Sequence, residues 1–239
     1  GPQGTLYGMN TEGGLIRLYS RNPFRYQGTD VKVSVGTKFL RKIEASHYEK
    51  LNDKTAFSLA GFYGGQNGFF RNQFDGARAD LINEFGGKGR FLWKPSGRLT
   101  FDFMADYQFT RQNGFPYGQI VTENEIASAP ITSPLYGLKA GTQMPNQNRQ
   151  SNYRRNILNT GVGIKYMGNG FDINSMTSWQ YLHDYMLMDI DYRPQDFIHL
   201  VQRQHGNALV EELSVKSRNN SRWHWTFGAF GSYQWLKIT

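Results

Sequence analysis

Cysteine, long apolar stretches and aliphatic residues are absent or scarce in this sequence of 239 residues. The absence of cysteine excludes a disulfide framework and any thiolate-based metal or redox site. No apolar run approaches the ~18 residues that a membrane-spanning helix needs, so a helical membrane protein is excluded. Hydrophobic residues make up only 38% of the chain, which is less than a soluble α/β domain normally uses.

Aromatic residues and glycine are plentiful instead, at 15% and 27 residues. This combination suits a transmembrane β-barrel, which turns apolar side chains toward lipid at alternate positions and lines its lumen with polar ones. The net charge of +8 favours acidic partners. Because the basic residues are scattered rather than gathered in one stripe, the sequence argues against a nucleic-acid partner.

Alternation at period two is clearest between Leu99 and Thr110 and recurs between Trp223 and Trp235. It predicts a lipid-facing set, Leu99, Phe101, Phe103, Ala105, Tyr107 and Phe109, and a lumenal set, Thr100, Asp102, Met104, Asp106, Gln108 and Thr110. Both stretches exceed the usual length of a soluble strand and suit the ~9 to 11 tilted residues that cross a bilayer.

Short and long connections take turns along the chain. Turn-forming clusters occupy 51–55, 94–98, 168–171 and 218–222, and longer joins cover about 65–81, 111–155 and 184–206. Such asymmetry is typical of outer-membrane barrels, with short periplasmic turns and long extracellular loops. The join 111–155 holds five basic and two acidic residues, and this net +3 predicts attraction of an anionic ligand.

The segments between these joins predict about nine strands, centred near Val31, Ile43, Leu59, Phe91, Phe103, Val162, Thr177, Leu213 and Phe227. Bacterial single-chain barrels close with an even number of strands, and an open edge in lipid leaves backbone groups unpaired. We therefore expect an all-β, partial antiparallel transmembrane barrel, with further strands after Thr239 and further chain before Gly1.

The first residues carry a resemblance to a known family. The segment GPQGTLYG, the Gly-Gly pair in TEGG and the strand-like LIRLYSRNP at 15–23 resemble the end of the plug domain of TonB-dependent outer-membrane receptors. The matching plug-motif residues are Gly1, Pro2, Gln3, Gly4, Thr5, Leu6, Tyr7, Gly8, Gly13 and Gly14. VEELSV at 210–215 is similar to a strand pattern of the same barrels.

The resemblance implies the C-terminal end of a plug at 1–26 and the N-terminal part of a barrel of about 22 strands at 27–239. It implies energised uptake of a scarce nutrient such as a ferric siderophore, driven by the proton-motive force through TonB. The expected partners are outer-membrane lipid and lipopolysaccharide, TonB, and a small-molecule ligand that includes metal chelates. We expect Glu212 on the lumen wall, with Arg17 or Arg21 as its hypothetical plug partner.

No catalytic constellation is present, and the sequence predicts neither an enzyme nor a cofactor or resident metal. Ser46 and His47 are strand neighbours that point to opposite faces, so they cannot form a nucleophile-base pair. His183, His199 and His205 share a join with Asp184, Asp189 and Asp191, but their spacing matches no compact metal motif.

Ligand contact is expected where aromatic and basic residues mix in the long loops. These candidates are Phe69, Phe70, Arg71, Arg111, Phe115, Tyr117, Tyr136, Arg149, Tyr153, Arg154, Arg155, Tyr185 and Tyr192. Two other function classes stay open: a passive outer-membrane porin or adhesin barrel, and a soluble all-β carbohydrate-binding module. The plug-like start argues against the first, and the lipid-facing aromatic sets argue against the second.

Overall fold

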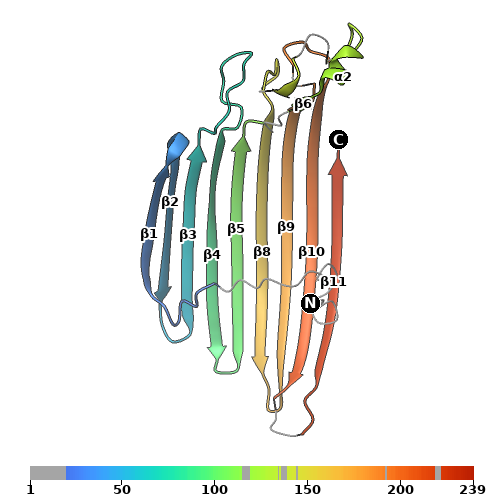
Figure 1. Cartoon of the computed structure of the whole chain (residues 1–239). Helices are drawn as coiled ribbons and strands as arrows, with labels where there is room; N and C mark the ends of the chain where they lie inside the picture. Colours follow the sequence, from blue (N-terminus) through green and yellow to red (C-terminus); the bar gives the residue numbers. More distant parts are fainter. Residues whose placement is uncertain are drawn as a thin grey trace.

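A computed structural model describes residues 20–114, 119–133, 135, 139–143, 145–191, 193–218 and 222–239 of the chain. Nine long strands form one antiparallel sheet in which each strand pairs with its neighbours along the chain (Figure 1). They are β1 (Gly28–Gly36), β2 (Leu40–Lys50), β3 (Thr55–Gln66), β4 (Ile82–Ser96), β5 (Leu99–Gln112), β8 (Asn152–Met167), β9 (Phe171–Asp189), β10 (His199–Ser217) and β11 (Thr226–Ile238). All nine predicted strands are confirmed.

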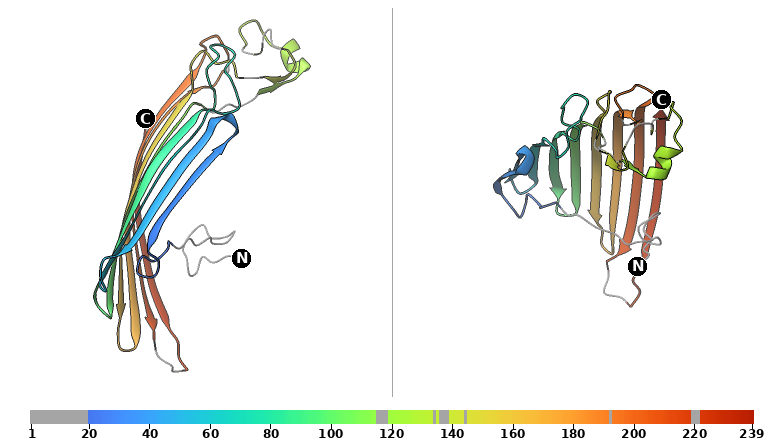
Figure 2. Two further views of the ribbon diagram at one scale, coloured as in Figure 1. Left: turned by 90° about the vertical axis from the view of Figure 1, so that its left-hand side faces the viewer. Right: turned by 45° about the horizontal axis from the view of Figure 1, so that its top comes forward.

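Three smaller elements lie in the connections. A 3-10 turn, η1 (Thr37–Phe39), joins β1 to β2. The short strands β6 (Gln119–Val121) and β7 (Gly141–Gln143) pair with each other, and helix α2 (Glu123–Ala127) follows β6. α2 stands clear of the end of the long sheet (Figure 2). No helix in the described part of the chain is long and apolar enough to cross a membrane.

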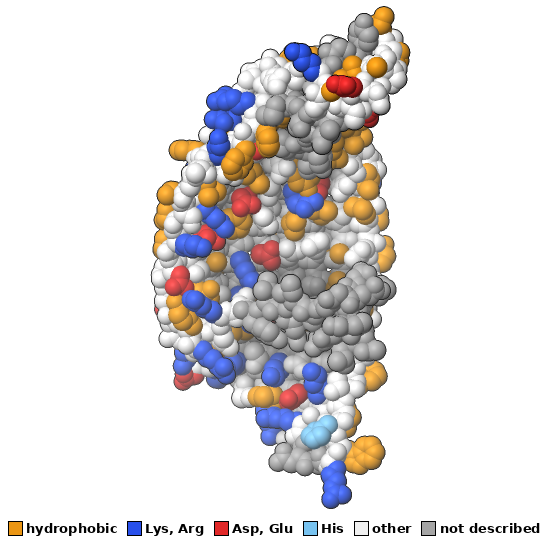
Figure 3. All heavy atoms as spheres, viewed as in Figure 1, with side chains coloured by type: hydrophobic (Ala, Val, Ile, Leu, Met, Phe, Trp, Pro, Cys, Tyr) orange, Lys and Arg blue, Asp and Glu red, His pale blue; other side chains and the backbone are white. Residues whose placement is uncertain are grey.

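The sheet is curved, and residues 20–27, which precede β1, lie on its concave side (Figure 2). Lys88 Nζ donates to Ser20 Oγ at 3.0 Å, and the Lys94 ammonium lies 3.9 Å from the centre of the Phe24 ring. The face that carries Lys88 and Lys94 is therefore the inner face, and the opposite one is the outer face. Figure 3 shows basic and acidic side chains intermixed on the inner side of the first strands.

Alternation along β5 places its side chains as predicted. Asp102, on the inner face, accepts from Arg90 Nε at 2.9 Å and from Nη2 at 2.6 Å, whereas Phe103 on the outer face is 39% exposed. The outer residues of β5 are apolar from Leu99 to Phe109, a span of about 25 Å for tilted strands, which matches the apolar band of a membrane barrel. Among the described residues the buried apolar side chains are only Ala56, Ala79, Leu92, Val121 and the prolines Pro23 and Pro145, so strand pairing rather than a central core holds this sheet together.

The four connections that the sequence predicts to be short lie at one end of the sheet. They cover 51–54, 97–98, 168–170 and 218–225, whereas the opposite end carries 37–39, 67–81, 113–151 and 190–198. Two predicted joins are therefore too long: 111–155 shrinks to 113–151, and 184–206 shrinks to 190–198. The strands continue beyond the apolar band, where backbone pairing persists but polar and apolar side chains mix on both faces and the alternation disappears.

Strand register settles the orientation of two neighbouring glutamates. Glu212 pairs with Met176 in the row that also contains Asp102, so it faces inward as predicted. Arg21 is bound to Asp30 at 2.7 Å, so its predicted pairing with Glu212 is wrong, and Arg17 lies outside the described residues. Glu211 faces outward and accepts hydrogen bonds from the hydroxyl groups of Ser175 and Thr177.

Candidate ligand-binding site

The structure redistributes the predicted ligand-binding residues. Phe115, Tyr117, Tyr136, Tyr192 and the whole plug motif from Gly1 to Gly14 lie outside the described residues. Phe69, Phe70 and Arg71 belong to the connection 67–81, and Arg149 belongs to 113–151. The loop assignment is wrong for five residues, which lie in strands: Arg111 in β5, Tyr153, Arg154 and Arg155 in β8, and Tyr185 in β9. These five residues lie where the strands extend past the apolar band, so the alternation of apolar and polar residues did not predict a strand there.

Alternation divides these five residues between the two faces. Arg155 is in the inner row of Asp184, together with Tyr153 two positions along β8. Arg111, Arg154 and Tyr185 form an outer row, because Arg111 pairs with Arg154 and Arg154 pairs with Tyr185. The structure therefore brings Tyr153 and Arg155 together on the lumen side and points the other three away from it.

Asp184 organises the inner pair, and only 4% of its surface is exposed. The Tyr153 hydroxyl donates to Asp184 Oδ2 at 2.9 Å, and the Arg155 guanidinium donates to the same carboxylate through Nε and through Nη2 at 2.8 Å. We call Tyr153, Arg155 and Asp184 the inner cluster. Asp184 is not among the predicted ligand-binding residues, because the prediction selects aromatic and basic side chains and the sequence does not show that Asp184 lies opposite Arg155.

Apolar and polar side chains mix around the inner cluster, whose partners on the neighbouring strands are Thr110 of β5 and Gln204 of β10. Ile157 follows Arg155 on β8, and Leu182 and Met186 flank Asp184 on β9, all at inner positions of the alternation. The cluster thus offers convergent polar groups beside a few apolar side chains, and such groups fix the orientation of a bound small molecule.

Two long connections meet through a pair of buried amides above the inner cluster. Asn72 Nδ2 donates to the Gln147 carbonyl at 2.7 Å, and the Gln147 backbone N–H donates to Asn72 Oδ1 at 2.7 Å. The Gln73 N–H also donates to the Pro145 carbonyl at 2.8 Å. The connection 67–81 is thereby fixed to the end of the connection 113–151.

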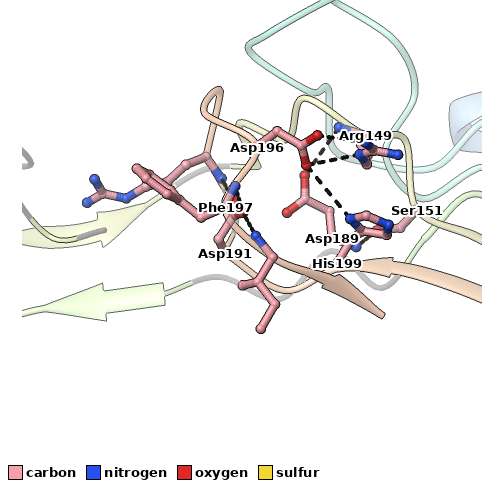
Figure 4. Close-up of polar contacts among 9 residues, drawn as sticks. Arg149, Ser151, Asp189, Asp191, Asp196, Phe197 and His199 are labelled. Atoms are coloured by element: carbon pink, nitrogen blue, oxygen red, sulfur yellow. Dashed lines mark hydrogen bonds and ion pairs between the residues drawn. The ribbon is translucent and has the colours of Figure 1, made fainter. Parts of the chain in front are cut away.

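A second set of contacts joins 113–151 to the connection 190–198 (Figure 4). The Arg149 N–H donates to Asp189 Oδ2 at 3.2 Å, and the Asp189 N–H donates to Ser151 Oγ at 3.1 Å. The Arg149 guanidinium also binds both oxygens of Asp196, at 3.0 and 2.6 Å. This guanidinium holds the pKa of Asp196 below its ordinary value.

The connection 67–81 presents aromatic side chains at the end of the sheet. Asp80 accepts from the backbone N–H groups of Phe69 and Phe70 at 2.7 and 2.9 Å, which closes the segment on itself. Phe69, Phe70 and Phe74 remain exposed. An exposed aromatic tip beside the barrel opening is suited to stacking on a planar ligand.

The histidines form no shared site. The rings of His183 and His205 stack at 4.4 Å on the outer face, whereas His199 lies 3.8 Å from Asp196 in the loop contacts. No group of three or more metal-ligating side chains occurs among the residues that the structure describes. Ser46 and His47 lie on opposite faces, as the alternation predicted, and His47 contacts Glu49 at 3.1 Å.

Comparison with known proteins finds receptors of one kind, although no protein-family model matches the chain. The chain is 22% identical over 166 residues to the ferrichrome outer membrane transporter/phage receptor of Escherichia coli K12, which covers 70% of this chain and 21% of that protein. The ferric yersiniabactin uptake receptor FyuA of Yersinia pestis superposes with a TM-score of 0.76 at 18% identity, over 100% of this chain and 35% of that one. The open form of the ferric-catecholate import receptor Fiu of Escherichia coli K12 gives 0.74 at 13% identity, over 99% and 38%.

The nine-stranded sheet thus has the fold of part of an outer-membrane siderophore-receptor barrel. The resemblance to TonB-dependent outer-membrane receptors is confirmed, and so is the localisation in the outer membrane. The chain spans about a fifth of the curated relative and about a third of the solved receptors. Because the relatives are transporters and receptors by name, the comparisons agree with the prediction that the chain is not an enzyme.

Proposed function

We propose that the chain forms part of a receptor that captures a ferric siderophore at the cell surface and imports it in a TonB-dependent, proton-motive-force-driven manner. The names of the three relatives support the siderophore, since each is a receptor or transporter for one such compound. The observation that carries the proposal for this chain is the inner cluster, in which a guanidinium and a phenol share one carboxylate on the lumen side below the joined long connections. TonB is the proposed partner of the whole receptor.

Arg155 is the proposed anchor for the ligand. Nε and Nη2 bind Asp184, whereas Nη1 takes no part in these bonds. A guanidinium held by one carboxylate keeps its orientation and can donate to a carboxylate or phenolate oxygen of an iron complex. Tyr153 adds an aromatic surface beside it.

The test uses the full-length receptor and three probes: ferrichrome, ferric yersiniabactin and a ferric catecholate. Uptake of one of them should collapse when an uncoupler dissipates the proton-motive force or when TonB is deleted. Arg155→Ala should weaken binding of that probe at least tenfold, whereas Arg154→Ala, one residue away on the outer face, should not. Uptake that persists without the proton-motive force would favour the passive porin instead.

In the proposed capture of the ligand, the connection 113–151 acts through its place at the end of the sheet and not through a net charge. Arg111, Arg154 and Arg155 lie in strands, so within 113–151 Lys139 and Arg149 are balanced by Glu123 and Glu125, and the predicted net +3 does not belong to this loop. Replacement of 113–151 by a short turn should still abolish high-affinity binding while the barrel folds, because strand pairing does not depend on the loop. Heat-modifiability on gels reports folding, and unchanged uptake by the folded variant would remove the loop from the proposal.

Lipopolysaccharide is the second partner that we propose. Arg111, Arg154, Tyr185 and Arg203 occupy one outer row across β5 to β10, without a carboxylate among them. The stacked pair of Trp179 and Tyr181 lies just below this row on β9. Aromatic residues with basic residues beyond them suit the boundary between acyl chains and phosphate groups. A double change of Arg154 and Arg203 to Ala should lower the lipopolysaccharide that copurifies, and Arg155→Ala should leave it unchanged; equal amounts would refute this partner.

A further inference from the structure

A buried polar core ties three extracellular segments to one another. Asn72 from 67–81 is 1% exposed and Gln147 from 113–151 is 3% exposed. Ser151 and Asp189, which join the end of 113–151 to the end of β9, are also fully buried. Side chains with this degree of burial cannot touch a ligand, so their role must be exerted through other residues.

The amide of Asn72 has no substitute within this core. Its oxygen and its nitrogen bind the two backbone groups of one residue, Gln147, and both distances are 2.7 Å. The Gln147 side chain continues the contact, since Nε2 donates to the Asp189 carbonyl at 3.4 Å. A buried backbone N–H or carbonyl that loses such a partner is left desolvated without a hydrogen bond, which is unfavourable. The bonds of Asn72 therefore stabilise the contact between 67–81 and 113–151.

The core is also continuous with the strands that hold the inner cluster. Ser151 precedes Tyr153 by two residues on the way into β8, and Asp189 ends β9, the strand of Asp184. The Asn148 N–H donates to the Arg193 carbonyl at 3.1 Å, which extends the connection into 190–198. A displacement of the core would shift the tops of β8 and β9 together.

We propose that segments 67–81, 145–151 and 193–198 move as one body, and that Asn72 is the positioning residue that fixes the aromatic tip relative to the inner cluster. The consequence for capture rests on the proposed function: a ligand that touches the exposed phenylalanines meets the inner cluster at a fixed offset. The loops then do not adapt to ligands one by one. The joined body itself is a property of the protein without ligand.

The first test is therefore ligand-free hydrogen exchange on the full-length receptor in detergent. Asn72→Ala should speed exchange at least tenfold in both 145–151 and 193–198, although neither contains the change. Asn124→Ala, on the exposed helix α2, is the matched control and should leave both segments unchanged. Faster exchange confined to 67–81 would overturn the proposal.

The absence of cysteine permits a rescue experiment. Gln73 and Pro145 share a backbone hydrogen bond, so Gln73→Cys with Pro145→Cys places two thiols in adjacent segments. The oxidised disulfide should restore slow exchange to Asn72→Ala, and reduction should remove it again. If Asn72→Ala does not fold, the disulfide alone decides: oxidation should leave uptake of the probe unchanged in a rigid body, and a loss that reduction reverses would show that the segments must separate.

Discussion

The sharpest test of the two faces is a depth series of arginine substitutions along β5. Phe103 lies near the middle of the outer apolar stretch from Leu99 to Phe109, and its ring centre is 6.4 Å from that of Phe91 and 6.2 Å from that of Phe101. Arginine on the lipid side at mid-depth costs about 2 to 4 kcal/mol, and the lost ring contacts add about 1 kcal/mol. Phe103→Arg should therefore lower the free energy of unfolding by about 3 to 5 kcal/mol.

Two matched variants on the same strand complete the series. Phe109→Arg, at the edge of the apolar stretch, should lower the free energy of unfolding by about 1 to 2 kcal/mol. A charge near the membrane interface destabilises the barrel only slightly, and the contact with Phe85 is lost. Gln108→Arg, on the inner face, should stay within about 0.5 kcal/mol. Denaturant unfolding of the full-length protein in lipid vesicles, with heat-modifiability as a check, measures all three. Equal losses for Phe103→Arg and Gln108→Arg would refute the assignment of faces.

Two further predictions concern single carboxylates. Thr177→Val removes one of the two hydroxyl donors of outward-facing Glu211 and should lower the free energy of unfolding by about 1 to 3 kcal/mol. Combining Thr177→Val with Glu211→Leu should recover that loss in the same unfolding assay. A double variant no more stable than the single one would contradict this prediction. Because the folded pKa of Asp196 is lowered, its link to Arg149 should hold above the ordinary aspartate pKa and fail as pH falls through the lower folded value. Hydrogen exchange of 145–151, corrected for intrinsic rates, should therefore rise below about pH 4 in the native protein, while Asp196→Asn should show the raised level already at pH 7.

Much of the nine-stranded sheet could be predicted, because successive residues of a strand face lipid and lumen in turn and must be apolar on one side and can be polar on the other. Phe103 and Asp102 reveal their faces by chemistry alone, and the spacing of the turns and long joins predicts all nine strands. The upper ends of β8 to β10 are harder to predict because apolar and polar residues mix on both faces there. Met186, Leu187 and Met188 are consecutive, so backbone pairing continues to Asp189 without an alternation to mark it.

The inner cluster lies in the upper parts of β8 and β9, which the sequence pattern did not predict as strand. Tyr153 and Arg155 were chosen for their chemistry, but their partner Asp184 could be recognised only from the register between β8 and β9. Register is a long-range property, because it fixes which residue of one strand lies opposite which residue of the next. The same holds for Asn72 and Gln147, which are separated by 75 positions and carry no local motif.

Arg154 and Arg155 are adjacent in the chain, yet one belongs to the membrane side of the wall and the other to the passage. Insertion or loss of a single residue within β8 would exchange the two environments along the rest of the strand, which would send lumenal polar groups into lipid. Outside a β-bulge such as the one between Trp93 and Ser96, a strand of this kind keeps its faces only when residues are added or lost in pairs, whereas a connection can change in length without exchanging the faces. We therefore expect receptors of this kind that bind different ligands to differ in their loops and at inner positions of the strands, while the number of residues in each strand stays nearly constant.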